Sequence, residues 1–382
     1  MNDRKIRTGI YTPVAPNPHT GVGRQLYGLI AGLAEIDSHN EYVLYTALDA
    51  PVPVQAANFQ NQPVPVRVSG RAKNHLFQLL QLPRLAAGHN LDVLHVPNSM
   101  PLLFPYRPTI VTIYDLTEFA LPQRVYEKGR HSYRRLANRL AARRADLIIT
   151  TSANTRQDIV RYLGVDEAKV RVIYPGIDHK QFRPQSISPA RKAHLAQKYQ
   201  LPERFLLYVG KIQPRKNLPR LLRAFHQVRK TLPDLHLVLA GSGGWMNETL
   251  QATIQQLELD PFAHFTGFVA DEDLPALYNL AEVMVFPSLY EGFGFPVVEA
   301  MACGTPVITS TTSSLGEIAD TAALCIDPTS VEEMAAALQT LLNDSQSHDA
   351  FRRKGLIRAQ AFTWIRCAEK TLACYHLCKS IW

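Results

Sequence analysis

The chain has 382 residues, of which 46% are hydrophobic and 19% are charged. This balance excludes long disorder, collagen and coiled coils, and the length suits two or three domains. Five cysteines, none in C-x-x-C spacing, argue against a disulfide framework or a structural zinc site and favour a reducing compartment. The sequence has no apolar run of the roughly 20 residues that span a bilayer, and it begins without a secretory signal, so we expect a cytoplasmic protein.

The net charge of +8 belongs to the first half of the chain. Residues 1–184 hold 23 Lys and Arg against 14 Asp and Glu, whereas residues 185–382 hold 18 against 19. Segment 124–144 alone has eight Lys and Arg against one Glu. It is either a solvated helix face or a surface for something anionic. The anionic inner face of the plasma membrane fits better than nucleic acid as a partner. The basic segment has few aromatic residues between its cations that could stack on bases, and the sequence has no nucleic-acid-binding motif.

Short β-branched runs alternate with helical patterns along the chain. In the first half we predict strands at 6–12, 42–46, 64–68, 93–96, 109–114, 147–151 and 170–174. In the second half we predict strands at 205–209, 235–239, 264–268, 283–286, 306–309 and 323–326. The alternation favours an α/β fold with two parallel sheets, each covered by helices on both faces.

Two further segments carry an apolar pattern. The leucine-rich stretch 74–85 is either core or an apolar patch that meets a membrane or a lipid tail. Segment 362–382 is predicted to be helical, with one apolar stripe. The stripe consists of Cys367, Thr371, Cys374, Cys378 and Ile381. Free cysteines in such a stripe are typical of buried apolar packing rather than of a metal site.

Polar residues follow two predicted strands of the second half, where ligands of parallel sheets bind. After 205–209 come Gly210, Lys211, Arg215 and Lys216, and a helix is predicted from about residue 218. Cations beside a helix start form an anion site suited to phosphates, although a solvated loop has the same composition. Glycines after 235–239 indicate either a plain turn or a close backbone approach.

The strongest signal is the string P-S-L-Y-E-G-F-G-F-P-V-V-E-A at 287–300, after the strand 283–286. Gly292 and Gly294 give a flexible backbone, and Pro296 suits a helix start. Glu291 then lies in a loop and Glu299 about one turn into the helix, so both can face one site. Carboxylates accept the two hydrogen bonds of a diol, and helix-start amides receive phosphate oxygens. These residues together favour a nucleotide-sugar ligand.

With these motifs the chain resembles glycosyltransferase family 4, which has the two-domain GT-B architecture. The resemblance rests on Glu291-x7-Glu299, the 210–216 loop, Y-P-G-I-D at 174–178, G-V-G at 21–23 and F-T-W at 362–364. It implies two Rossmann-like β/α/β domains facing an interdomain cleft, with a last helix crossing back to the N-terminal domain. We expect an acceptor domain at 1–180, a donor domain at 181–361 and the returning helix at 362–382.

The resemblance also implies roles for individual residues. The residues expected to act at the reacting sugar and diphosphate are Glu291, Lys216, Lys211, Tyr114 and Asp115. Tyr114-Asp115 stands where many members have His-Asp. The residues expected to bind the donor are Gly23, Gly210, Arg215, Phe268, Val269, Gly292, Phe293, Gly294, Phe295 and Glu299, with Glu299 on the ribose diol and Phe268-Val269 on the base.

The implied activity is a retaining transfer of a hexose from a nucleoside diphosphate sugar to a saccharide or lipid-linked saccharide in envelope polysaccharide synthesis. UDP-glucose is the favoured donor and GDP-mannose the alternative. A GT-B epimerase or a nucleotide-sugar binding protein is a further alternative. We expect no catalytic metal and no cofactor. Retention is expected to come from same-face attack, in which the departing phosphate takes the proton of the acceptor.

Overall fold

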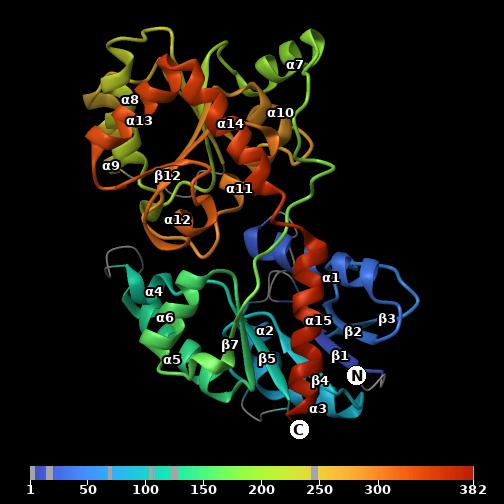
Figure 1. Cartoon of the computed structure of the whole chain (residues 1–382). Coiled ribbons are helices and arrows are strands. Elements are labelled where there is room, and N and C mark those ends of the chain that lie inside the picture. Colours follow the sequence, from blue (N-terminus) through green and yellow to red (C-terminus); the bar gives the residue numbers. More distant parts are fainter. Residues whose placement is uncertain are drawn as a thin grey trace. The chain divides into compact units, whose positions relative to one another are not determined.

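The computed structural model describes residues 5–13, 20–67, 71–102, 106, 108–121, 128–241 and 248–381. The chain forms two compact units (Figure 1). Unit 1 comprises Met1–Gly176 and Thr363–Trp382, and unit 2 comprises Ile177–Phe362. The units therefore meet in sequence at 176/177 and 362/363, close to the expected boundaries after residues 180 and 361.

Unit 1 contains a parallel sheet with the strand order β3-β2-β1-β4-β5-β6-β7. Its strands are β1 (Arg7–Tyr11), β2 (Glu41–Ala47), β3 (Phe59–Val64), β4 (Val93–Val96), β5 (Thr109–Ile113), β6 (Leu147–Thr150) and β7 (Val170–Val172). Its helices are α1 (Gly21–Ile36), α2 (Arg71–Leu80), α3 (Leu82–Gly88), α4 (Thr117–Ala120), α5 (Lys128–Arg144), α6 (Ala153–Leu163) and α15 (Trp364–Ser380).

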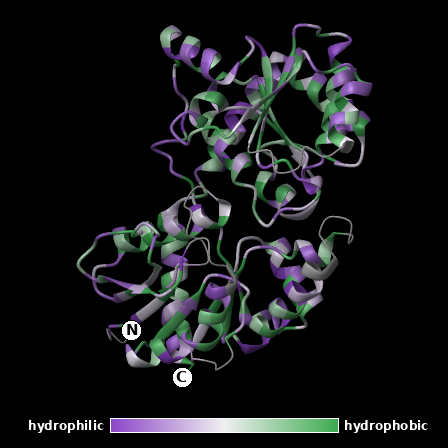
Figure 2. Ribbon diagram, turned by 180° about the vertical axis from the view of Figure 1, so that it is seen from behind, coloured by the Kyte–Doolittle hydropathy of each residue, from purple (hydrophilic) through white to green (hydrophobic). Residues whose placement is uncertain are grey.

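The two faces of this sheet have separate cores, because alternate side chains of a strand point to opposite faces. Val43 and Tyr45 of β2 pack with residues of α2, α3, α5 and α6. Tyr42 and Leu44 of the same strand pack with α1 and α15. Both faces are thus covered by helices, as the alternating sequence pattern predicts, and Figure 2 shows hydrophobic residues along the strands between them.

The last helix returns to unit 1, as expected. Figure 1 shows α15 (red) beside α1 (blue) on the same face of the sheet. The predicted apolar stripe is buried at its cysteines and at Thr371, whereas Ile381 is 55% exposed. The three cysteines of α15 lie in the core with α1, and none of the chain's five cysteines forms a disulfide.

Unit 2 contains a second parallel sheet with the strand order β10-β9-β8-β11-β12-β13. Its strands are β8 (Phe205–Val209), β9 (His236–Ala240), β10 (Ala263–Gly267), β11 (Val283–Phe286), β12 (Val307–Ser310) and β13 (Leu324–Ile326). Its helices are α7 (Pro189–Tyr199), α8 (Leu218–Arg229), α9 (Glu248–Gln256), α10 (Leu274–Leu280), α11 (Phe295–Cys303), α12 (Ser313–Ala319), α13 (Val331–Asn343) and α14 (Ser345–Ala359).

Two expectations about local structure are corrected. The strand expected at 64–68 lies upstream as β3, which among the described strands pairs with β2 alone and forms an edge of the sheet. The leucine-rich stretch is neither wholly core nor wholly surface, because Phe77 and Leu82 are buried while Leu76 is 56% exposed.

Candidate functional site

The loop after β8 is folded onto the loop after β11. Gly210 follows β8 with a φ of 149°, and residues 214–216 form a 3₁₀ turn. Asn217 then adopts the left-handed conformation, and its side-chain amide donates to the carbonyls of Pro287, at 3.1 Å, and Pro328, at 2.6 Å. Helix α8 begins at the next residue. These contacts set the 3₁₀ turn against the loop that carries Glu291.

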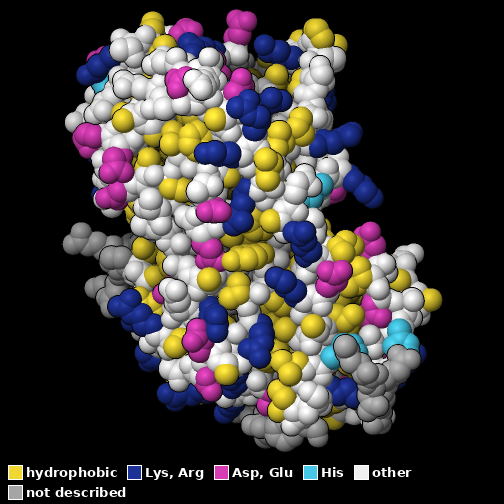
Figure 3. Space-filling model, viewed as in Figure 1, with side chains coloured by type: hydrophobic (Ala, Val, Ile, Leu, Met, Phe, Trp, Pro, Cys, Tyr) yellow, Lys and Arg dark blue, Asp and Glu magenta, His cyan; other side chains and the backbone are white. Residues whose placement is uncertain are grey.

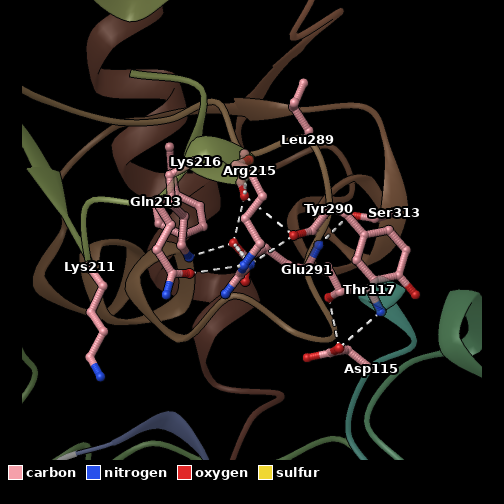
Figure 4. Close-up of polar contacts among 12 residues, drawn as sticks. Asp115, Thr117, Lys211, Gln213, Arg215, Lys216, Leu289, Tyr290, Glu291 and Ser313 are labelled. Carbon is pink, nitrogen blue, oxygen red and sulfur yellow. Dashed lines mark hydrogen bonds and ion pairs between the residues drawn. The ribbon is translucent and has the colours of Figure 1, made fainter. Parts of the chain in front are cut away.

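Two predicted cations and one predicted carboxylate meet at this point (Figure 4). Lys216 Nζ lies 2.5 Å and Arg215 Nη1 lies 2.6 Å from Oε1 of Glu291. Ser288 Oγ donates to the same oxygen at 2.6 Å. We call Arg215, Lys216, Ser288 and Glu291 the Glu291 cluster.

The Glu291 cluster is largely withdrawn from solvent. Lys216 and Glu291 are 7% and 8% exposed, and Lys216 Nζ also lies 4.5 Å from the centre of the Phe286 ring. Burial by itself favours a protonated carboxyl, but the charges and hydrogen bonds of Lys216 and Arg215 lower the pKa of Glu291 to about 2. Glu291 is therefore a permanent anion at neutral pH.

Serine hydroxyls hold the Glu291 loop in place, and the sequence did not lead us to assign them a role. Ser313 Oγ accepts from the backbone N–H of Glu291 at 3.0 Å. Ser314 Oγ donates to the backbone carbonyls of Glu291, at 2.9 Å, and Phe293, at 3.1 Å. Both serines follow β12, so the rule that sites lie just after parallel strands could have found them.

The glycine-rich stretch leads directly into α11. Gly294 caps that helix with a φ of 106°, and a Cβ there would lie 2.6 Å from Cδ2 of Leu315. A side chain at this position is therefore excluded by both conformation and space. Gly292 and Phe295 are half-buried, and Phe293 is buried. The first turn of α11 thus begins four residues after Glu291.

Glu299 lies on α11 but in the interior of unit 2. It is 1% exposed, and its Oε2 accepts from the hydroxyl of Tyr278 on α10 at 2.9 Å. The ribose role of Glu299 stays a prediction, and a ribose could reach this carboxylate only if the covering side chains move.

The remaining predicted donor residues of unit 2 differ in exposure. Lys211 is exposed and points away from the Glu291 cluster (Figure 4), while its carbonyl accepts from the hydroxyl of Tyr208 at 3.2 Å. Phe268 follows β10 and is 63% exposed, whereas Val269 is buried. An exposed phenyl ring at a strand end can stack on a flat ligand.

Three predicted residues belong to unit 1. The backbone N–H of Gly23 donates to Oγ1 of Thr20, which caps α1, at 3.0 Å. Tyr114 follows β5 and is half-buried, and burial raises its pKa. Asp115 Oδ1 accepts from both the backbone N–H and the hydroxyl of Thr117, at 3.1 and 2.7 Å, so part of its hydrogen-bonding capacity stabilises the start of α4.

One Asp-x-Asp string, a spacing that could hold a cation, occurs at 271–273. Asp273 is 1% exposed and pairs with Arg191, with Lys198 at 2.8 Å and with the hydroxyl of Tyr199 at 2.7 Å. Burial would raise the pKa of Asp273, but the hydrogen bonds from Lys198 and Tyr199 lower it. Its partners show that Asp273 ties α7 to α10. Among the described residues, no three His, Cys, Asp or Glu side chains gather as a metal site would need.

The basic segment falls mainly on α5, although residues 122–127 and the side chains of 128–131 lie outside the described structure. Arg134 and Arg135 fold back onto Glu118, through its carboxylate and its carbonyl respectively. Tyr133 and Leu136 are 51% and 57% exposed. Within the part of the chain that is described, no helix is both long and apolar enough to cross a bilayer.

Comparisons with known proteins support this architecture. The model of Glycosyltransferase Family 4 matches residues 19–181, and that of Glycosyl transferases group 1 matches residues 192–357. O-antigen chain mannosyltransferase B of Escherichia coli is 30% identical over 384 residues, which covers 94% of this chain and 97% of the relative.

Two further matches support only part of this conclusion, one in coverage and one in sequence identity. The serotype-specific mannosyltransferase WbdA of E. coli is 32% identical over 238 residues, which covers 61% of this chain but only 29% of that protein. Sucrose-phosphate synthase from Thermosynechococcus elongatus matches 99% of this chain and 100% of its own with a TM-score of 0.76 at 22% identity, a likeness of fold. With two parallel-sheet units, a returning last helix and a full-length relative of this kind, the chain belongs to the family 4 glycosyltransferases of GT-B fold.

Proposed function

We propose that this chain is a retaining mannosyltransferase that moves mannose from GDP-mannose to a saccharide acceptor during the assembly of an envelope polysaccharide. The Glu291 cluster carries the proposal of a nucleoside diphosphate donor, because it holds two cations beside a helix start. Mannose is favoured over glucose because the full-length relative is an O-antigen chain mannosyltransferase and the partial relative is also a mannosyltransferase.

Lys216 and Arg215 bind the diphosphate of the donor, with Lys211 as a more exposed third cation. Two cations, one of them buried, converge on a single oxygen here, and such a pair can form charge-assisted hydrogen bonds with the oxygens of a diphosphate. The first turn of α11 supports them with the positive end of its dipole. The exposed ring of Phe268 stacks on the base, and Glu299 accepts from the ribose.

The reaction breaks the bond between C1 of the hexose and the phosphate oxygen, and it forms a bond from C1 to the acceptor oxygen on the same face. The proton of the acceptor hydroxyl passes to the departing phosphate. Lys216 and Arg215 stabilise the charge that develops on that phosphate. Glu291 is a poor nucleophile, since three donors already hold its Oε1, so a covalent sugar–enzyme intermediate is disfavoured.

The donor is tested by a screen for nucleotide release with GDP-mannose and UDP-glucose, using lipid extracts and polysaccharide fragments as acceptors. We expect GDP-mannose to support turnover and GDP to raise the melting temperature more than UDP. Turnover with UDP-glucose alone would restore the donor favoured from the sequence. Binding of neither nucleotide would overturn the proposed site.

Unit 1 binds an anionic membrane surface through the outward face of α5. Exposed apolar side chains, Tyr133 and Leu136, alternate there with exposed Arg139 and Arg143. Aromatic and leucine side chains insert at the lipid interface, and arginines pair with anionic headgroups. Figure 3 shows Lys and Arg side chains (dark blue) over part of the surface of this unit.

Vesicle flotation tests this surface with phosphatidylglycerol vesicles against phosphatidylcholine vesicles. Leu136→Glu is expected to abolish binding to the anionic vesicles. Ile357→Glu is the matched control, because Ile357 is an exposed aliphatic residue of unit 2, at 75% exposure. Equal flotation of the wild type with both lipids would overturn the membrane surface.

A further inference from the structure

The carboxylate of Glu291 forms ion pairs with the same two cations that would bind the donor diphosphate. Lys216 Nζ and Arg215 Nη1 both lie within 2.6 Å of one carboxylate oxygen. Arg215 Nη1 also donates to the carbonyl of Tyr290 at 2.9 Å. A diphosphate that takes the same two nitrogens must therefore compete with Glu291 for them.

We infer that Glu291 is an internal counter-ion that the donor diphosphate displaces and that returns when the nucleotide leaves. This inference rests on the proposed function, in which Lys216 and Arg215 bind the diphosphate. Since Glu291 keeps its negative charge at all physiological pH values, it opposes every anion that enters the cluster. Two serines hold Glu291 in this position. Ser288 donates a hydrogen bond to Oε1 of its side chain, and Ser313 accepts one from its backbone N–H.

The competition affects donor and product differently. A nucleotide sugar brings hydroxyls that can donate to the displaced carboxylate, so its diphosphate and its sugar act together. The nucleoside diphosphate product has lost the hexose and its hydroxyls, so the carboxylate of Glu291 returns to the cations and opposes product binding. Glu291 thereby sets the preference of the enzyme for donor over product and promotes release of the nucleotide.

Calorimetric titration of the full chain with GDP and with inorganic pyrophosphate tests the inference without any acceptor. Glu291→Gln removes the charge and keeps the shape, so GDP is expected to bind about three- to tenfold more tightly. Lys216→Ala is expected to weaken GDP binding about tenfold or more. In a Lys216→Ala background, Glu291→Gln should increase GDP affinity by a smaller factor, because the lysine for which Glu291 and GDP compete is absent.

The matched control is Glu203→Gln, which removes an exposed carboxylate of unit 2 before β8 and should leave GDP affinity unchanged. If Lys216→Ala weakens GDP but Glu291→Gln does not tighten it, the counter-ion inference is wrong and the diphosphate site stands. If Lys216→Ala leaves GDP affinity unchanged, the proposed site itself is wrong. Should Glu291→Gln not fold, Glu291→Asp replaces it. The aspartate side chain is one methylene shorter and holds Lys216 and Arg215 less closely, so GDP should still bind more tightly than to the wild type.

Discussion

Glu291 is a buried anion whose charge depends on two neighbouring cations. In the unfolded chain its pKa returns to about the ordinary 4.5, whereas in the folded chain the pKa is about 2. The unfolded state therefore binds more protons between these values, and folding is favoured by raising the pH. The contribution is complete above about pH 4.5 and is lost as the pH falls towards 2.

This predicts a pH-dependent difference between the wild type and Glu291→Gln. Urea denaturation between pH 6 and pH 2.5 should show the stability advantage of the wild type falling by up to about 3 kcal/mol. Other carboxylates titrate in both proteins, so only the difference is informative. A difference that stays constant over this range would mean that Glu291 is not stabilised as an anion by Lys216 and Arg215.

Glu299 combines a buried structural contact with a predicted ligand role, and the two can be separated. Tyr278→Phe removes only the hydroxyl that donates to Glu299, so it should cost about 1 kcal/mol of stability and leave the KM for the donor nearly unchanged. Glu299→Gln should instead raise the KM for the donor about tenfold or more. Equal effects of both variants on KM would assign Glu299 to the fold alone.

The sequence predicts the three charged residues of the Glu291 cluster, but it predicts neither Ser288 nor how the residues pair. Arg215, Lys216 and Glu291 are identifiable because they follow strands of a parallel sheet. The contacts of Ser313 and Ser314 depend on the loop conformations after β11 and β12, which no periodic pattern encodes. The sequence also does not predict that Lys216 lies in the Glu291 cluster while Lys211 points away from it, because this difference depends on the 3₁₀ turn at residues 214–216.

Among the elements, α1 and α15 pack closely because glycines face an indole. A Cβ on Gly28 would lie 2.2 Å from the Trp364 ring, and one on Gly32 would lie 2.7 Å from the Trp364 carbonyl. Gly28→Ala should therefore lower the free energy of unfolding by about 1–3 kcal/mol, measured by thermal or chemical denaturation. Two small residues one turn apart thus set the distance between the helices.

Gly88→Ala is the control for this packing, because a Cβ on Gly88, the last residue of α3, would have no heavy atom within 4 Å. Alanine there should be neutral or slightly stabilising. If both substitutions cost the same, the loss at Gly28 would come from the backbone and not from the indole.

The alternation of strands and helices is the part of the fold that hydrophobic periodicity predicts best, and β3 shows where it fails. The strand reads F-Q-N-Q-P-V, with three consecutive amides and a proline. An edge strand pairs on one side only, so exposed amides and a proline are tolerated there. A prediction based on buried β-branched residues therefore places the strand at the mostly apolar residues 64–68, at the end of β3, and misses most of β3.

At the scale of the whole molecule, catalysis is expected to depend on protein cations and not on a bound metal ion. With GDP-mannose and an extract containing the acceptor, turnover in excess EDTA should stay within about twofold of the untreated enzyme, because Lys216 and Arg215 supply the charge that a metal would supply. Loss of turnover that added Mg²⁺ or Mn²⁺ restores would contradict this expectation.

The return of α15 has a consequence for how the protein is made. Tyr375 accepts or donates a hydrogen bond with Nδ1 of His95 at 2.8 Å, across 280 residues of chain, and Cys367, Cys374 and Cys378 complete the core beside α1. During translation all of unit 2 leaves the ribosome before this helix does. The nascent unit 2 can therefore form its sheet first, while one face of unit 1 is covered by α1 but not yet by α15.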